Sequence, residues 1–174
     1  MSAAPRVDAV RLTGFAAAVY SGAGMPEADA RLVADTLVQA DLWGHQSHGV
    51  LRLGWYLDRV RNKVMNPVTK PEFTVDAGAV AVIDGHDGVG HVLTALATRE
   101  AVKRARAHGI GVVGVRLSNH FGTCMYYTLM GAREGCVMVR SLFRQAQAER
   151  VCGTAASAAM TTRSSTSSSI CTTV

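Results

Sequence analysis

The sequence has few aromatic residues, few prolines and no long run of apolar side chains. Aromatic residues make up 6% of the chain although 48% of it is hydrophobic, so the core must consist mostly of Ala, Val and Leu. No segment approaches the ~18 consecutive apolar residues of a membrane-spanning helix, and residues 1–8 lack the apolar region of a signal peptide. These absences predict a cytoplasmic globular protein without a membrane partner.

The four cysteines show no C-x-x-C spacing, which argues against the common zinc and dithiol motifs. We therefore expect reduced thiols in an intracellular protein. His86, Asp87 and His91 lie close in sequence but lack the spacing of zinc ligands, so we predict no metal site. Cys124 falls within a predicted helix and is expected to be a small core residue rather than a nucleophile.

The formal charge of +5 is unevenly distributed, because four arginines and a single acidic residue follow Gly135. No basic stripe alternates with aromatic residues, as nucleic-acid-binding surfaces often do. We therefore expect no nucleic-acid partner. The opposite interpretation, in which the basic tail binds nucleic acid, predicts salt-dependent binding by residues 136–174 and ranks last.

Apolar residues at helical spacing predict three helices in the first part of the chain. They cover residues 7–22, 26–43 and 47–63, and the first two are ended by Gly22 and Gly44. The inner face of the third is expected to consist of Leu51, Trp55, Leu57 and Val60.

The pattern changes after Asn66-Pro67. Alternating apolar residues predict one or two strands within residues 73–83. The following segments are expected to be a tight turn at 84–90, a helix at 91–108, a buried strand at 110–115, a helix at 121–133 and the beginning of a strand at 136–139. Strands alternating with helices predict a mixed α/β fold.

These patterns divide the chain into three expected parts: a helical domain at residues 1–70, a partial α/β domain at 71–139 and a tail at 140–174. The tail differs in composition, since about half of residues 152–174 are Ser or Thr and none is aromatic. Such a segment gains too little from burial to offset its ordering entropy. The sequence therefore predicts disorder from residue 152.

A hydroxyl, an imidazole and a guanidinium lie close together in residues 44–52, GHQSHGVLR. On a helix, His48 and Arg52 share a face. His48 can transfer a proton near neutral pH, Arg52 can bind a carboxylate through two hydrogen bonds, and Ser47 can orient the imidazole. This set suits a 2-oxo or 2-hydroxy acid. Alternatively, Ser47 is a helix N-cap, and His48 and Arg52 are solvated surface residues.

A second polar cluster, SNHFG at residues 118–122, directly follows the predicted buried strand. Ligands often bind where a strand ends and a helix begins in α/β folds. The alternative is that Ser118 or Asn119 caps a helix and His120 has no role. The glycine-rich residues 84–90 do not begin a dinucleotide fingerprint, because Leu93 stands where G-x-G-x-x-G requires its last glycine.

Three segments in this order resemble the malate/L-lactate dehydrogenase family, which is distinct from the Rossmann-type lactate and malate dehydrogenases. They are ADLWGHQSHGVLRL (40–53), IDGHDGVGH (83–91) and GIGVVGVRLSNHFG (109–122), followed by Tyr126-Tyr127 and Gly135. The family includes malate, L-sulfolactate and ureidoglycolate dehydrogenases and cyclic imino acid reductases. The resemblance implies an N-terminal helical bundle followed by the start of the family's non-Rossmann cofactor-binding α/β domain.

The resemblance also implies hydride transfer between NAD or NADP and a small 2-hydroxy or 2-oxo acid, or a cyclic imino acid, in a homodimer. It implies that His48 donates or accepts a proton, with Ser47 as its relay partner, and that Arg52 binds the substrate carboxylate. Some members use the histidine matching His120 as the acid/base, so both histidines are catalytic candidates. The expected cofactor-binding residues are His120, Phe121, Gly122, Thr123 and Cys124.

The tail departs from this family pattern. Family members are about twice as long, and residues 140–174 resemble none of them. We interpret the chain as truncated after about residue 137, with a reading-frame change as the suggested origin of the tail, and expect its activity to be impaired. The alternative function is a non-catalytic remnant, a helical dimerisation module that lacks cofactor binding.

Overall fold

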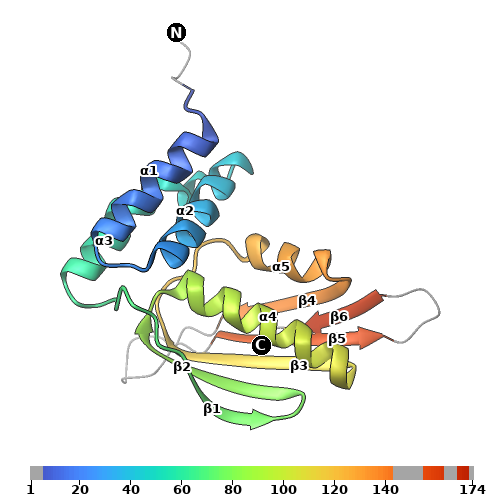
Figure 1. The fold of residues 1–174 in the computed structure, drawn as a ribbon. Helices are drawn as coiled ribbons and strands as arrows, with labels where there is room; N and C mark the ends of the chain where they lie inside the picture. Colours follow the sequence, from blue (N-terminus) through green and yellow to red (C-terminus); the bar gives the residue numbers. More distant parts are fainter. Residues whose placement is uncertain (1–5, 143–154, 163–167, 173–174) are drawn as a thin grey trace.

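The computed structural model describes residues 6–142, 155–162 and 168–172. Its helices and strands form the predicted mixed α/β fold (Figure 1). Three N-terminal helices gather together, and two further helices, α4 and α5, lie on one face of a sheet. Within the described ranges, no helix is long and apolar enough to cross a membrane.

The first two N-terminal helices begin and end close to where the sequence predicts. Helix α1 is Ala9–Gly22 and helix α2 is Glu27–Leu42. The carboxylate of Asp8 accepts a hydrogen bond from the Arg11 amide (2.9 Å) and caps α1. Together with α3 (Leu53–Arg61), these helices enclose a core that includes the fully buried Tyr20 and Tyr56.

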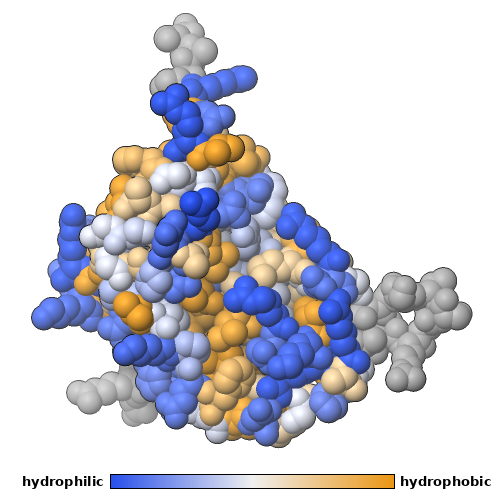
Figure 2. All heavy atoms as spheres, in the orientation of Figure 1, coloured by the Kyte–Doolittle hydropathy of each residue, from blue (hydrophilic) through white to orange (hydrophobic). Residues whose placement is uncertain are grey.

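Helix α1 leaves much of its apolar side uncovered. It buries Ala16, Ala17 and Tyr20, whereas Val10 and Phe15 are 80% and 61% exposed. Figure 2 shows apolar residues gathered on the part of this face where the N-terminal helices lie. Exposed apolar surface of this kind often marks a site of association.

The third helix is shorter than predicted. Gln46–His48 and Val50–Arg52 form two short 3₁₀ helices, and α3 begins only at Leu53. The two turns are separated by Gly49, which is extended, and the Asp41 carboxylate accepts a hydrogen bond from the Val50 amide (2.8 Å). This contact holds the chain out of a continuous helix. Leu51 is therefore 80% exposed, and its predicted place on an inner face is wrong.

The sheet is built on a parallel pair of strands, β2 and β3, connected by helix α4. The strand order is β1-β2-β3-β5-β4-β6, with additional pairing between β5 and β6. The elements are β1 (Glu72–Ala77), β2 (Val80–Gly88), α4 (Gly90–His108), β3 (Ile110–Ser118), α5 (Cys124–Arg133), β4 (Cys136–Leu142), β5 (Ala155–Thr162) and β6 (Ser168–Thr172).

Two local predictions differ from the structure. Residues 84–90 are not a simple tight turn, because β2 continues to Gly88 with a kink at His86 and Asp87, whose φ angles are 46° and 56°. Helix α5 begins at Cys124 rather than at Phe121, since Gly122 has a φ of 78°, which a right-handed helix cannot contain. Cys124 is consequently exposed at the start of α5 and is not a core residue.

The tail also differs from its prediction of disorder. Strand β5 pairs antiparallel with β3, and β6 pairs parallel with β4, so residues 155–162 and 168–172 are strands in the structure. Ladder hydrogen bonds join backbone groups and need no large side chain, and neither strand contains proline. Residues 152–154, 163–167 and 173–174 lie outside the described residues.

The core between α4 and the sheet is made of small side chains, as the scarcity of aromatics predicts. A side chain on Gly111 would clash with the backbone of Ala101, so α4 lies close against β3. The fully buried alanines of this core are Ala81, Ala97, Ala101 and Ala105. Other parts of the core contain larger side chains. The largest fully buried side chains are those of Tyr20, Tyr56 and Tyr127.

Candidate active site

Two segments far apart in sequence meet beside the start of α3. Ser47 and His48 come from the first 3₁₀ turn, and His120 comes from the loop between β3 and α5. Ser47 Oγ lies 2.9 Å from His48 Nδ1. The His48 and His120 rings stack with their centroids 5.6 Å apart and their planes at 26°. The structure thus brings the three predicted catalytic residues together.

Arg52 lies at the edge of this cluster. Its Nε donates a hydrogen bond to the Ser47 carbonyl oxygen (2.7 Å), and its guanidinium carbon is 5.5 Å from the centre of the Trp55 ring. Among the described residues, Arg52 has no carboxylate within ion-pair distance. Its two terminal nitrogens therefore remain available for a bidentate contact with a carboxylate ligand.

Sequence reasoning missed Tyr56, which sets the protonation pattern of His120. The Tyr56 hydroxyl oxygen is 2.6 Å from His120 Nδ1, and the Gly122 amide donates to the same nitrogen (3.2 Å). Burial raises the pKa of Tyr56, against the opposing effect of Arg52 and Arg59, so the hydroxyl keeps its proton and donates it. Because Nδ1 accepts from both groups, neutral His120 carries its proton on Nε2.

Trp55 forms a wall of the same cluster. Its ring meets the His120 ring edge to face, with centroids 5.7 Å apart. The guanidinium carbon of Arg59 lies 4.9 Å from the ring centre, near enough for a cation–π contact. The sequence placed Trp55 on the inner face of a helix, but it is 38% exposed.

The buried side chain of Asn119 makes the hydrogen bonds that hold the loop between β3 and α5 against neighbouring elements. It is 7% exposed. Its Nδ2 donates to the carbonyl oxygens of Asp87 (2.7 Å), Gly88 (3.2 Å) and Val64 (3.3 Å). Its Oδ1 accepts from Arg59 Nε (3.0 Å) and Nη2 (2.5 Å). The Asn119 side chain therefore connects α3 and the end of β2 to the loop that carries His120, and it does not cap a helix.

The other predicted cofactor residues differ in accessibility. Phe121 is 6% exposed and packs against Tyr127, so its ring belongs to the core. Thr123 Oγ1 is 3.4 Å from His45 Nδ1, and the Thr123 side chain makes no capping hydrogen bond to α5. Thr123 is buried, Gly122 is half-buried and Cys124 is exposed, so accessibility increases toward the first residue of α5.

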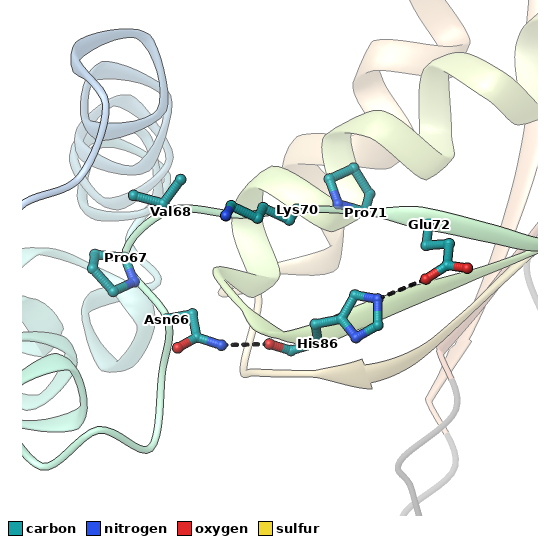
Figure 3. A pocket seen from close by; sticks show the side chains of 7 residues that line it. All are labelled: Asn66, Pro67, Val68, Lys70, Pro71, Glu72 and His86. Carbon is teal, nitrogen blue, oxygen red and sulfur yellow. Dashed lines mark hydrogen bonds and ion pairs between the residues drawn. The ribbon is translucent and has the colours of Figure 1, made fainter.

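A pocket of about 600 Å³ lies apart from this cluster, between residues 66–72 and the end of β2 (Figure 3). Asn66 Nδ2 donates to the His86 carbonyl oxygen (2.6 Å), and His86 Nε2 lies 3.1 Å from a Glu72 carboxylate oxygen. No predicted site residue lines it. In the part of the chain that the structure describes, no group of three or more His, Cys, Asp or Glu residues could hold a metal ion.

Gly49→Ala is expected to displace the His48 turn and to lower the free energy of unfolding by about 1–3 kcal/mol. The added methyl group would clash with the Asp41 carboxylate. Gly54→Ala is the matched control, because nothing lies within 4 Å of a methyl group there, and alanine in a helix is favoured by up to about 1 kcal/mol. Urea unfolding of both variants checks this; equal stabilities would contradict it.

Comparison with known proteins identifies the family. The family model described as malate/L-lactate dehydrogenase matches residues 7–170. The chain belongs to the malate/L-lactate dehydrogenase family. The matched range extends to residue 170 and so includes most of the segment 140–174 that we expected to depart from the family. Its composition of small residues concealed a strand, β5, within the matched range.

Individual relatives agree with this assignment. A malate dehydrogenase from Pyrococcus horikoshii is 42% identical over 132 residues, which cover 76% of this chain and 37% of the relative. An L-sulfolactate dehydrogenase from Methanocaldococcus jannaschii is 38% identical over 114 residues, covering 66% of this chain and 33% of the relative. The crystal structure of malate dehydrogenase from Entamoeba histolytica superimposes with a TM-score of 0.77 at 32% identity, covering 96% of this chain and 48% of that one. The chain thus spans about a third of the length of these curated relatives.

Proposed function

We propose that this chain carries the acid/base and substrate-binding residues of an NAD(P)-dependent oxidoreductase. Its substrate would be a small 2-hydroxy or 2-oxo acid, or a cyclic imino acid. The observation that supports this most directly is the stacking of His48 on His120, with Ser47 and Arg52 at the edge of the pair. The relatives named as malate and L-sulfolactate dehydrogenases support the substrate class, since both names refer to 2-hydroxy acids.

In this proposal, Arg52 binds the substrate carboxylate through its terminal nitrogens. A bound nicotinamide cofactor supplies the hydride for reduction of the carbonyl carbon and accepts it in the reverse direction. Protonated His48 gives its proton to the carbonyl oxygen, and neutral His48 takes a proton from the hydroxyl in oxidation. The Nε2–H of His120 donates a hydrogen bond to the same oxygen. Ser47, which is exposed, returns the proton to His48 from solvent.

The start of α5 suits the anionic part of such a cofactor. The first amides of a helix have no intrahelical partner, and they bind phosphate groups readily. Thr123 leaves these amides without a side-chain cap. We assign cofactor contacts here to His120, Gly122, Thr123 and Cys124, and to the backbone of Phe121. This assignment applies to NAD and NADP alike.

We further propose that the protein is a cytoplasmic homodimer. The exposed Val10 and Phe15 of α1 offer an apolar surface for a second copy. Cys124 is a free thiol in the structure, which is compatible with a reducing compartment.

Titration of the 174-residue chain with NADH and with NADPH, followed by cofactor fluorescence, tests the proposal. We expect saturable binding of at least one cofactor and its slow oxidation when a 2-oxo acid such as oxaloacetate or pyruvate is added. Far-UV circular dichroism confirms that the chain is folded. A folded chain that binds neither cofactor would favour the alternative, a non-catalytic helical dimerisation module.

Variants in the same assay separate the roles. His48→Ala is expected to lower turnover by about 10²–10⁴-fold, the usual contribution of a positioned acid/base. Arg52→Ala is expected to raise KM more than it lowers kcat, because it removes ground-state binding. Arg61→Ala is the control, since Arg61 is exposed and its one ion pair among the described residues is with Asp58 at 3.7 Å. Unchanged kinetics in His48→Ala or Arg52→Ala would contradict that residue's role.

A further inference from the structure

His91 lies beneath both groups that donate to His120 Nδ1. Its side chain is fully buried in the first turn of α4. It meets the Tyr56 ring edge to face, with centroids 4.9 Å apart and planes at 75°. On another side it faces the Gly122 backbone, where an added methyl group would lie 3.0 Å from His91 Nε2 and 3.3 Å from Cδ2. One ring therefore supports the two donors that fix His120.

The same turn of α4 supports the backbone on either side of His120. A side chain on Gly90 would clash with the carbonyl oxygens of Asn119 and His120. The Gly122 backbone in turn rests on His91. Residues 119–122 thus lie directly on the first two residues of α4, and a change in His91 would be transmitted to this loop.

His91 acts in this position through its shape. Among the described residues, neither of its ring nitrogens has a hydrogen-bond partner. Burial, together with the nearby His120, lowers the pKa of His91 to about 3, so the ring is uncharged at neutral pH. An uncharged ring without hydrogen bonds holds its neighbours chiefly through packing.

We propose that His91 is a positioning residue that holds Tyr56 and Gly122 in place and thereby keeps the proton of neutral His120 on Nε2. Its importance for catalysis rests on the proposed function, in which Nε2–H contacts the substrate oxygen. The effect of His91 on His120 itself depends only on the contacts described above. It can therefore be tested without cofactor, substrate or turnover.

The test is ¹⁵N NMR of the histidine rings in the uniformly labelled 174-residue chain at pH 7.5. The His120 resonances are assigned by their loss in His120→Gln. We expect the unmodified chain to show His120 with Nδ1 unprotonated and Nε2 protonated. In His91→Ala the two tautomers exchange, so the two ring nitrogen shifts move toward each other. His91→Phe, which restores a neutral planar ring, is expected to return them to their original positions.

Leu93→Ala is the matched control, because Leu93 is equally buried in α4 but packs in the core between α4 and the sheet. It should destabilise the chain and leave the His120 shifts unchanged. The proposal is overturned if His91→Ala leaves these shifts unchanged, if Leu93→Ala moves them as much, or if His91→Phe behaves like His91→Ala. Should His91→Ala not fold, His91→Val takes its place, since it removes the ring and keeps part of its volume. Because NADH is absent throughout, failure of cofactor binding cannot be confused with failure of this inference.

Discussion

Replacing Asn119 by leucine is expected to lower the free energy of unfolding by about 3–5 kcal/mol. Leucine has nearly the same size, but it makes none of the hydrogen bonds of this 7% exposed amide. The carbonyl oxygens of Asp87 and Gly88 would lose their donor, and the Arg59 guanidinium would lose its acceptor. An unpaired buried polar group costs about 1–3 kcal/mol, so several lost partners give this large effect.

Asn66→Ala is the control for this substitution. Asn66 is exposed and donates one side-chain hydrogen bond to the same kinked end of β2, at the His86 carbonyl oxygen (2.6 Å). Water can replace that bond, so a loss of about 1 kcal/mol or less is expected. Urea unfolding monitored by circular dichroism measures both variants. Similar losses of unfolding free energy in Asn119→Leu and Asn66→Ala would show that the buried hydrogen bonds of Asn119 contribute little to stability.

Asn119 also illustrates what the sequence could not predict about the site. Within SNHFG, an asparagine before a helix suggests a cap, because capping is a local pattern. Its actual partners come from residues 59, 64, 87 and 88, which no local pattern connects to it. The same holds for Tyr56, since a buried tyrosine at helical spacing has the pattern of any core residue.

The elements were predictable where periodicity alone decides them. Helices α1, α2 and α4 lie close to their predicted ranges, because apolar residues on a helix repeat at the spacing of one face. Strand β3 also lies close to its predicted range, because it is a short apolar run rich in β-branched residues. The break before α3 was not predictable, because it depends on Asp41 reaching Val50 from the preceding helix. The motif placed Ser47, His48 and Arg52 together correctly in space, but on 3₁₀ turns rather than on one α-helical face.

On acidification from pH 6.5 to pH 4.5, the free energy of unfolding is expected to fall by about 2 kcal/mol through His91 alone, with a slope that approaches about 1.4 kcal/mol per pH unit at the acidic end. Burial is the main cause that lowers the pKa of His91 to about 3 from its ordinary value of 6.5. Within this window the unfolded chain binds a proton at this position and the folded chain does not. Stability therefore rises with pH and is lost on acidification, by about 2 kcal/mol over the two units.

Carboxylate groups act in a different pH window. A hydrogen bond from Arg104 lowers the pKa of the Asp76 carboxyl, and a hydrogen bond from the His86 amide lowers that of Asp84, both from 3.8. Their stabilising contribution is fully present above the ordinary carboxyl pKa and is lost only as the pH falls below it. Acid unfolding between pH 6.5 and 4.5 is thus separable from their protonation.

His91→Phe isolates the histidine contribution. Its stability is measured by urea unfolding at several pH values and subtracted from that of the unmodified chain, which removes the effect of every group the two share. Phenylalanine is larger and can cost about 1–3 kcal/mol through overpacking, but that cost does not vary with pH. The difference between the two chains should therefore change by about 2 kcal/mol between pH 6.5 and 4.5. The control is His108→Gln, because His108 is an exposed histidine at the end of α4. This variant should show the same change of unfolding free energy with pH as the unmodified chain.

Parallel curves for His91→Phe and the unmodified chain would mean that His91 takes up its proton in the folded state. The proposal that an uncharged His91 ring supports Tyr56 and Gly122 would then have to be abandoned.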